Sequence, residues 1–139
     1  MSEQNIELQR RVIAAFNARD IEAGLGYFDP SIEWHSMLAE VGATYRGHAE
    51  MRRWNSELLA AWDEMRTEPD AYFDLGEHVV VSGTIHGRGQ RSGAVVTMPF
   101  ALVAKWRDGL LVYAKMVPDR EAAFRELGVI GDELEPIEP

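Results

Sequence analysis

The feature that most constrains this chain is the alternation of apolar and polar residues between positions 71 and 117. Three segments in it have the length and composition of strands: HVVVSGTIHGRG at 78–89, AVVTMPFALVAKW at 94–106 and LLVYAKMV at 110–117. The Asp-Gly pair that joins the last two is typical of a tight hairpin. A shorter strand, AYFDL at 71–75, precedes them. Consecutive strands with short turns predict an antiparallel meander.

The first part of the chain has a helical period instead. Apolar side chains recur at helical spacing over residues 4–18, which predicts a helix. Asp20 stands where an N-cap is needed for a short second helix that runs to about Phe28. Asp29-Pro30 predicts a turn, and residues 31–36 predict a strand. We therefore expect two helices and one strand before the first loop.

The clearest helical pattern covers residues 48–64, after a loop around Gly42 and an extended piece at 43–46. One stripe carries its large apolar residues, which are Met51, Trp54, Leu58, Trp62 and Met65. A final helix, REAAFREL at 120–127, follows a cap at Asp119 and ends at a glycine.

Helices gathered on one face of a curved antiparallel sheet define an α+β class. The chain has 139 residues, which suits one domain, and 46% of them are apolar, which is enough for one core. We find no internal repeat and no boundary. We expect a single domain over residues 1–128, followed by a loose acidic tail at 129–139 that contains prolines.

The composition narrows the classes of partner. The net charge is −9, so the basic surface that binds nucleic acid or an anionic membrane is missing. There is no cysteine, and the four histidines lack metal-ligand spacing, so we expect neither a metal site nor a cofactor. No apolar run approaches the ~20 residues that cross a bilayer, and the N-terminus is polar. The predicted location is the cytoplasm.

A glycine-rich stretch, GRGQRSG at 87–93, has the composition of a phosphate-binding loop. Such a loop needs a strand before it and a helix after it, so that the helix N-terminus meets the phosphate. A strand follows here, so we interpret the stretch as a flexible hairpin tip. Its Arg88 and Arg91 then remain candidates for a lid or a partner contact.

Several stretches together carry a resemblance to a known family. They are AAFNARDIEAGLGYF, IEWH, YRGHAEMRRW, VVVSGTIHGRGQRSG, MPFALVAKWRDG and PDREAAFRELG. From Val12 to Gly128 the chain resembles the SnoaL-like branch of the nuclear-transport-factor-2-like superfamily. The resemblance implies a cone-shaped fold, in which a curved antiparallel sheet wraps around the long helix and N-terminal helices close an apolar pocket. Relatives include ketosteroid isomerases, polyketide cyclases and limonene epoxide hydrolase, and many pair as dimers through the outer sheet face.

The catalytic groups of those relatives do not recur at the matching positions. The isomerases use a carboxylate base, a tyrosine and a protonated aspartic acid, and these positions fall on Ser36, Val12 and Leu102. The last-strand carboxylate of the epoxide hydrolases and cyclases falls on Met116. Because fold membership does not fix chemistry, the resemblance implies the pocket and leaves the reaction open.

The facing of His35 is the main uncertainty in the predicted site. In the strand at 31–36, the apolar Ile32 and Trp34 share a face with Ser36, and His35 lies on the opposite face. If the apolar pair faces the pocket, His35 points outward. A one-residue gap or a bulge just before the strand reverses the faces and brings His35 to the position of the base. Both alternatives stay open.

Alternation along the meander gives the sheet an apolar inner face. It places Val112 inside and Tyr113 and Lys115 outside. The residues that we predict to bind the substrate are Phe16, Tyr27, Trp34, Trp54, Leu58, Tyr72, Val81, Ile85, Phe100, Leu102 and Met116. Such a pocket suits a small hydrophobic or aromatic molecule.

Three functions are compatible with this pocket. The first is a cofactor-independent isomerase, cyclase or hydrolase in which His35 acts as the base and Ser36 or a tyrosine hydroxyl polarises a carbonyl. The second is a non-catalytic binder of a hydrophobic ligand. The third is a dimeric interaction module whose pocket is only core. The resemblance implies a homodimer through the outer sheet face in each case.

Overall fold

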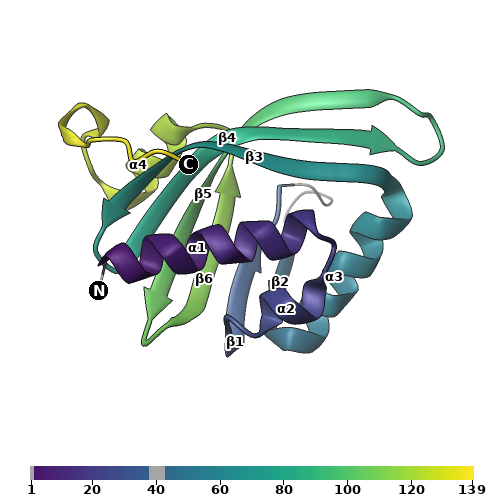
Figure 1. Cartoon of the computed structure of the whole chain (residues 1–139), viewed down its shortest axis with the longest axis horizontal. Helices are drawn as coiled ribbons and strands as arrows, with labels where there is room; N and C mark the ends of the chain where they lie inside the picture. Colours follow the sequence, from purple (N-terminus) through teal and green to yellow (C-terminus); the bar gives the residue numbers. More distant parts are fainter. Residues whose placement is uncertain (1, 38–42) are drawn as a thin grey trace.

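The computed structural model describes residues 2–37 and 43–139 and forms one curved, open sheet with helices packed on it (Figure 1). The strands are β1 (Phe28–His35), β2 (Thr44–Arg46), β3 (Trp62–Leu75), β4 (His78–Gly89), β5 (Val95–Arg107) and β6 (Leu110–Val117). They lie in the order β2-β1-β6-β5-β4-β3, and all neighbours are antiparallel except β1 and β6. The predicted α+β class and the antiparallel meander are confirmed.

The helices pack on both faces of this sheet. They are α1 (Ser2–Asn17), α2 (Ile21–Leu25), α3 (Gly47–Ala61) and α4 (Arg120–Leu127). The first three lie over the concave face, and α4 lies at the opposite face near the C-terminus (Figure 1). Asp20 and Asp119 cap α2 and α4 through their carboxylates, as predicted.

Strand β1 begins earlier than predicted. The turn expected at Asp29-Pro30 is instead part of the strand, and the register with β6 shifts between Phe28 and Glu33. The irregularity accommodates the proline, which has no N–H for a regular ladder. Ile32 and Trp34 are 0% and 6% exposed, so the apolar pair faces the core. The predicted loop around Gly42 lies outside the described residues.

The boundary between α3 and β3 corrects the sequence analysis. We predicted a helix to residue 64 and a strand over 71–75, but α3 ends at Ala61 and β3 begins at Trp62. β3 pairs with β4 from Trp62 opposite Gly89 to Leu75 opposite His78. A β3 that began at residue 71 would leave half of β4 without a partner for its backbone groups.

Pro69 lies within β3, where a proline normally interrupts a sheet. β3 is an edge strand, and its register with β4 shifts between Pro69 and Ala71. The facing residue on β4 is Gly83, and a Cβ at this position would be 2.2 Å from the carbonyl oxygen of Glu68. The glycine therefore permits the close approach of the two strands at the irregularity.

Two apolar clusters lie on opposite faces of the sheet. The inner one packs against α1 and α3 and contains, as predicted, Val79, Val81, Ile85, Phe100, Leu102 and Trp106. The outer one lies beneath α4 and contains Phe73, Val80, Ala101, Val103, Val117 and Phe124. Val112 is a correction, because a register shift in the β5–β6 pair places Leu111 opposite Trp106. Leu111 is therefore fully buried, whereas Val112 is only partly buried.

The C-terminal segment is packed against the domain, so the expectation of a loose tail is wrong for it. Ile137 and Tyr72 exchange two backbone hydrogen bonds of 2.9 and 2.7 Å. The guanidinium of Arg10 donates to the carbonyl of Glu138 at 2.8 Å. β3 is an edge strand with free backbone groups, and the segment pairs with one of its residues.

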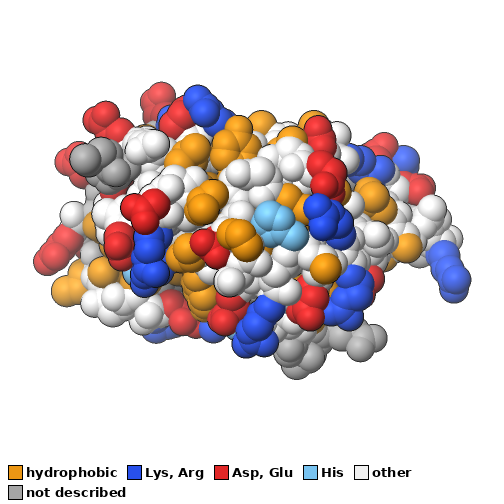
Figure 2. Space-filling model, turned by 90° about the horizontal axis from the view of Figure 1, so that it is seen from below, with side chains coloured by type: hydrophobic (Ala, Val, Ile, Leu, Met, Phe, Trp, Pro, Cys, Tyr) orange, Lys and Arg blue, Asp and Glu red, His pale blue; other side chains and the backbone are white. Residues whose placement is uncertain are grey.

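The surface carries charges of both signs. On the face shown in Figure 2, acidic and basic side chains are interspersed with apolar ones, and no field of one sign covers it. Among the residues that the structure describes, no helix is long and apolar enough to cross a membrane. The cytoplasmic location stays a prediction from the sequence.

Candidate ligand-binding cavity

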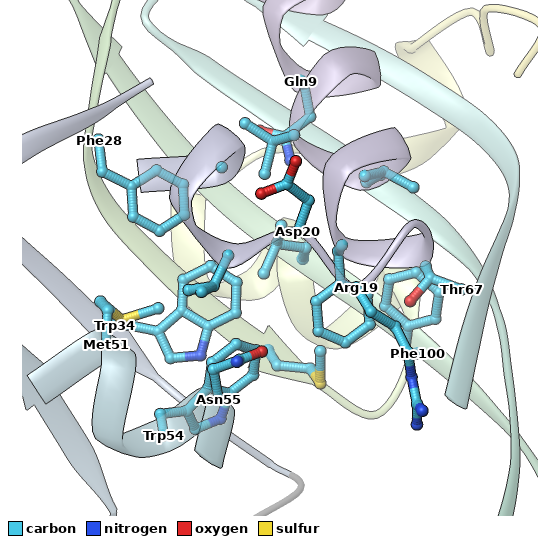
Figure 3. A pocket seen from close by; sticks show the side chains of 17 residues that line it. Gln9, Arg19, Asp20, Phe28, Trp34, Met51, Trp54, Asn55, Thr67 and Phe100 are labelled. Carbon is cyan, nitrogen blue, oxygen red and sulfur yellow. The ribbon is translucent and has the colours of Figure 1, made fainter. Parts of the chain in front are cut away.

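A cavity of about 60 Å³ lies between the concave face of the sheet and the helices α1, α2 and α3 (Figure 3). Its wall is mostly apolar and includes Val12, Ile13, Phe16, Ile21, Phe28, Trp34, Met51, Trp54, Phe100, Leu102 and Met116. These residues come from three helices and from the strands β1, β5 and β6, so the cavity exists only in the folded domain.

Aromatic rings form a continuous series along this wall. The rings of Phe28 and Trp34 stack with centroids 6.0 Å apart. Trp34 is 5.1 Å from Trp54, and Trp54 is 5.7 Å from Phe16. Separations in this range are those of favourable aromatic pairs. The wall is therefore a preformed apolar surface to which a flat molecule can bind.

Gln9 is the polar residue at the α1 side of the cavity. Its side chain is 0% exposed, and its Oε1 accepts a hydrogen bond of 2.9 Å from Nε1 of Trp106. Nε2 of the same amide is buried and has no partner among the described residues. A buried donor without a partner costs about 1–3 kcal/mol, so such groups are rare in folded proteins.

Two tryptophans of the wall differ in how their indole N–H groups are used. Nε1 of Trp54 donates to Oγ of Ser36 at 3.0 Å. Nε1 of Trp34 is buried and has no partner within the described part of the chain. The cavity is thus lined by one indole whose N–H is paired and by one whose N–H is not.

The exposed end of the cavity carries its charged residues. Arg19 has a φ of 60° and joins α1 to α2, and its guanidinium donates to the carbonyl of Trp62 at 3.2 Å. Asp20 caps α2 by accepting from the backbone N–H of Ala23 at 3.1 Å, and its carboxylate still lines the cavity (Figure 3). Asn55 of α3 lies on the same wall. A ligand that enters from solvent meets these three side chains first.

Six of the eleven predicted binding residues line the cavity: Phe16, Trp34, Trp54, Phe100, Leu102 and Met116. Val81 and Tyr27 belong to the surrounding core without lining it. Leu58 and Ile85 line two other hollows, of about 20 and 160 Å³, and Met65 of β3 belongs to the wall of both.

Tyr72 is also outside the cavity. It is 2% exposed, its backbone pairs with Ile137, and the Arg10 guanidinium lies 5.2 Å from the centre of its ring. Burial raises the pKa of the Tyr72 phenol to about 12. The residue therefore serves the junction between β3 and the C-terminal segment.

His35 lies on the outer face of the sheet. Its Nε2 is 2.6 Å from Oε2 of Glu33, and its Nδ1 is 3.1 Å from Oγ1 of Thr44. Its ring centroid is 5.3 Å from that of Tyr113. None of these residues lines the cavity, because burial of Ile32 and Trp34 turns the odd-numbered neighbours outward. The outward alternative holds, and a base at His35 inside the pocket is wrong.

Ser36 is adjacent to the cavity but does not line it. Its hydroxyl accepts the hydrogen bond from Trp54, so it orients that indole. The expected role of polarising a substrate carbonyl is therefore not supported by its position. Its observed role is to position an aromatic wall residue.

Sequence analysis missed the polar residues of the cavity, namely Gln9, Arg19, Asp20, Asn55 and Thr67. A signal was present for Gln9, because it stands on the apolar stripe of the first helix. A polar residue at a core-facing position has either a partner or a function. Asp20 was assigned only to the helix cap, which it also provides.

The SnoaL-like domain family matches residues 9–114, and the chain belongs to this family. TerC, co-crystallised with polyporic acid, is 31% identical, with 89% of this chain and 97% of that chain covered and a TM-score of 0.75. An NTF2-like protein of unknown function from Burkholderia pseudomallei is 27% identical, with coverages of 88% and 95% and a TM-score of 0.76.

More distant structures share the fold alone. One is a putative polyketide cyclase from Xanthomonas campestris pv. campestris, which is 14% identical, with coverages of 87% and 94% and a TM-score of 0.75. Another, from Catenulispora acidiphila, has a ketosteroid isomerase-like fold and is 16% identical, with coverages of 91% and 95% and a TM-score of 0.74. No curated protein matches the chain. The predicted cone-shaped fold and the SnoaL-like resemblance are confirmed.

Proposed function

We propose that this protein binds a small, mostly apolar aromatic molecule in the cavity beneath α1, α2 and α3. The observation that carries the proposal is the series of aromatic rings from Phe28 through Trp34 and Trp54 to Phe16. Ligand sites in proteins are concave, mainly apolar and supplied with a few polar groups, and this cavity has that composition.

The lining favours binding over proton transfer. Among the described residues that line the cavity, only Arg19 and Asp20 have ionisable side chains, and both are exposed. General acid and base catalysis needs a group of suitable pKa within hydrogen-bond reach of the substrate. The deep part of the wall offers amide, hydroxyl and indole groups instead. We therefore rank a non-catalytic binder ahead of an isomerase, cyclase or hydrolase.

The size of the cavity limits the ligand. A cavity of about 150 Å³ accommodates benzene in a well-studied engineered protein, and this cavity measures about 60 Å³. A ligand with one aromatic ring therefore requires side chains at the exposed end to move aside. Arg19, Asn55 and the short helix α2 are the elements that border this end.

A relative supplies the first probe. TerC is 31% identical to this chain and was co-crystallised with polyporic acid. We propose that the present protein takes a ligand of related shape. Polyporic acid is therefore the compound to titrate first.

The test compares two methionine-to-phenylalanine variants. Met116→Phe adds bulk to the cavity, whereas Met98→Phe adds the same bulk outside it, and both methionines are partly buried. By calorimetric titration we expect Met116→Phe to bind polyporic acid at least tenfold more weakly than the wild type, and Met98→Phe to bind it equally well. No binding by the wild type, or equal binding by both variants, contradicts the proposal.

The observation that favours catalysis as a second candidate is the Asp20 carboxylate on the cavity wall. Asp20→Asn keeps an N-cap residue for α2 and removes the base. If the cavity is catalytic, the wild type converts the probe to a product of changed retention or mass, and Asp20→Asn binds without converting it. Equal conversion by both proteins excludes Asp20 as the base.

We also propose that two copies pair through the outer face of the sheet, beside α4. Glu33, His35, Tyr113 and Lys115 form a partly exposed strip there that carries both signs of charge. Such a strip suits a self-complementary contact. We expect sedimentation velocity to give a dimer, and Tyr113→Arg to lower the dimer fraction. A wild-type monomer at high micromolar concentration contradicts the proposal.

A further inference from the structure

The buried polar atoms without a partner are concentrated at the cavity. Among the described residues, the buried side-chain nitrogen and oxygen atoms that lack a hydrogen bond are Nε2 of Gln9 and Nε1 of Trp34. Both residues line the same cavity. Gln9 is 0% and Trp34 6% exposed, so bulk water does not satisfy these groups. Both atoms are N–H donors, and both need an acceptor.

The orientation of the Gln9 amide follows from its one partner. The indole N–H of Trp106 can only donate, so the amide oxygen of Gln9 must face it. The amide NH₂ is then turned to the other side, and Figure 3 shows the Gln9 side chain reaching the cavity from α1. Trp34 reaches the same cavity from β1 (Figure 3). The two donors thus belong to two different walls.

Resting on the proposed function, we propose that Gln9 and Trp34 are the specificity-determining donors of the cavity, and that its ligand is an aromatic molecule with carbonyl-type acceptor oxygens. An acceptor on the ligand replaces the missing partner of each donor. A hydrocarbon of the same shape leaves both donors unpaired, and sites built to hydrogen-bond a ligand reject analogues that lack the matching group. The apolar wall supplies affinity, and the two N–H groups select the oxygen.

The charges around the cavity favour a neutral ligand. The net charge of the chain is −9, and the Asp20 carboxylate lies at the exposed end. Both features weaken the binding of an anion, so the acidic polyporic acid is expected to bind less tightly than a neutral molecule of the same shape. The guanidinium of Arg19 also lies there, but it donates to the carbonyl of Trp62. A ketone, quinone or phenol meets these conditions better than a carboxylate does.

The test uses two probes that differ in one atom group. Acetophenone and α-methylstyrene have nearly the same shape, but the first has a carbonyl oxygen where the second has a methylene group. We expect the wild type to bind acetophenone more tightly by about fivefold for each donor used, which is the usual net effect of one hydrogen bond. Calorimetric titration or displacement of polyporic acid gives both constants.

Matched tryptophan variants identify the donor. Trp34→Phe removes the unpaired N–H, and Trp54→Phe removes an N–H that Ser36 already accepts. Both changes remove an indole from the same wall, so they have similar effects on the apolar contact. We expect Trp34→Phe to reduce the preference for acetophenone by about fivefold and Trp54→Phe to leave the preference unchanged. Gln9→Met removes the other donor and also the acceptor of the Trp106 indole, so we expect it to lower both the preference for acetophenone and the stability of the fold.

Nuclear magnetic resonance gives a readout that does not depend on affinity. The chain has four tryptophans and so four indole N–H signals. The signal that disappears in the Trp34→Phe spectrum is that of Trp34. Acetophenone is expected to shift the Trp34 indole proton downfield as a new hydrogen bond forms, and α-methylstyrene is not. The Trp54 signal serves as the internal control, because its donor is already engaged.

The outcomes separate this inference from the proposed function. If neither probe nor polyporic acid binds the wild type, the proposed function fails and this inference fails with it. If the wild type binds acetophenone and α-methylstyrene equally, and the Trp34 and Gln9 variants also bind the two probes equally, the cavity binds ligands but Gln9 and Trp34 do not select them. Any variant with a lost fold is recognised by its circular dichroism spectrum, and the wild-type indole shifts then still decide the question.

Discussion

On the outer face of the sheet, the polar side chains of a cluster beneath α4 are bonded to one another, whereas on the inner face two buried N–H groups have no partner among the residues that the structure describes. The hydroxyl of Ser82 donates to the carboxylate of Asp70 at 2.6 Å. The guanidinium of Arg120 donates to Asp70 at 3.1 Å and to the hydroxyl of Ser82 at 3.0 Å. Gln9 and Trp34 on the inner side each present an unpaired donor. Paired polar groups stabilise the fold, and unpaired buried ones lower its stability.

The largest effect is expected where the two strands of the edge hairpin approach each other. In Gly83→Ala, the new Cβ would lie 2.2 Å from the carbonyl oxygen of Glu68 and 2.8 Å from Cα of Pro69. Both neighbours are backbone, so β3 must move away from β4. We expect a loss of about 3–5 kcal/mol in the free energy of unfolding, measured by urea denaturation. Thr84→Ala, one residue further, is the control and should cost less than about 1 kcal/mol.

Deletion of one aromatic ring on each face of the sheet distinguishes the effect on stability from the effect on ligand binding. Phe124 is 6% exposed and packs edge-on against Phe73 at 5.0 Å on the outer face, and Phe100 is 2% exposed and lines the cavity. Both alanine variants should lose about 3–5 kcal/mol of stability. We expect Phe100→Ala to change the affinity for polyporic acid and Phe124→Ala to leave it unchanged when measured on the folded protein. Equal changes would mean that the two faces are coupled.

The meander was predictable because one buried face fixes the register of each strand. Val79, Val81, Phe100 and Leu102 have the facing that their alternation indicates, since a slip by one residue would expose them all. The beginning of β3 was not predictable, because residues 62 and 65 continue the helical stripe of α3 and also fit an irregular strand. Pairing with β4 selects the strand over the helix for these residues, and this pairing joins parts of the chain that are distant in sequence.

The candidate site was predictable to the extent that burial determines it. Large aromatic residues such as Trp34 and Trp54 favour burial, and their spacing in the sequence assigned both to the inner side of the sheet. The unpaired donors were not predictable, because Gln9 meets Trp106 across 97 residues and the partner of each indole depends on the folded geometry. His35 has the right chemistry for a base, but its side chain lies on the outer face of the sheet, away from the cavity.

A smaller effect is expected from the outer polar cluster. Ser82→Ala removes the hydroxyl that donates to Asp70 and accepts from Arg120, and the serine is 4% exposed. We expect a loss of about 1–2 kcal/mol in the free energy of unfolding, because a charged group loses a hydrogen bond and keeps another. Thermal unfolding should show it, with ligand binding unchanged. A neutral result would show that the cluster is solvated and does not brace α4.

The inner face should respond differently to loss of an N–H group. Trp34→Phe and Trp54→Phe remove similar aromatic volume, but within the described part of the chain only the indole N–H of Trp54 has a hydrogen bond to lose. Trp34→Phe also removes an unpaired buried donor, which is itself unfavourable. We expect Trp34→Phe to be the more stable of the two by about 1 kcal/mol in urea denaturation without ligand. The reverse order would mean that Trp34 has a partner in solution.

The smallest effect concerns the pair of Glu33 and His35 on the outer face. The hydrogen bond from His35 lowers the pKa of Glu33 below its ordinary value of 4.5, and the charges of His35 and Arg46 act in the same direction, although partial burial opposes them. A carboxylate whose pKa is lowered on folding stabilises the protein above pH 4.5, and this contribution is lost as the pH falls through the folded pKa. The melting temperature of Glu33→Gln should therefore fall less than that of the wild type below this pH.

The control for that measurement is Glu135→Gln, which removes one exposed carboxylate from the C-terminal segment. Both variants lose the same charge. A difference between their melting temperatures at acidic pH therefore reports the hydrogen bond to His35 and not the change in net charge. If the melting temperatures of the two variants fall equally at acidic pH, water replaces the hydrogen bond of 2.6 Å between Glu33 and His35 in solution. In that case the outer strip is available to a second copy of the chain with its charges unpaired, and dimer formation should then weaken as salt is raised.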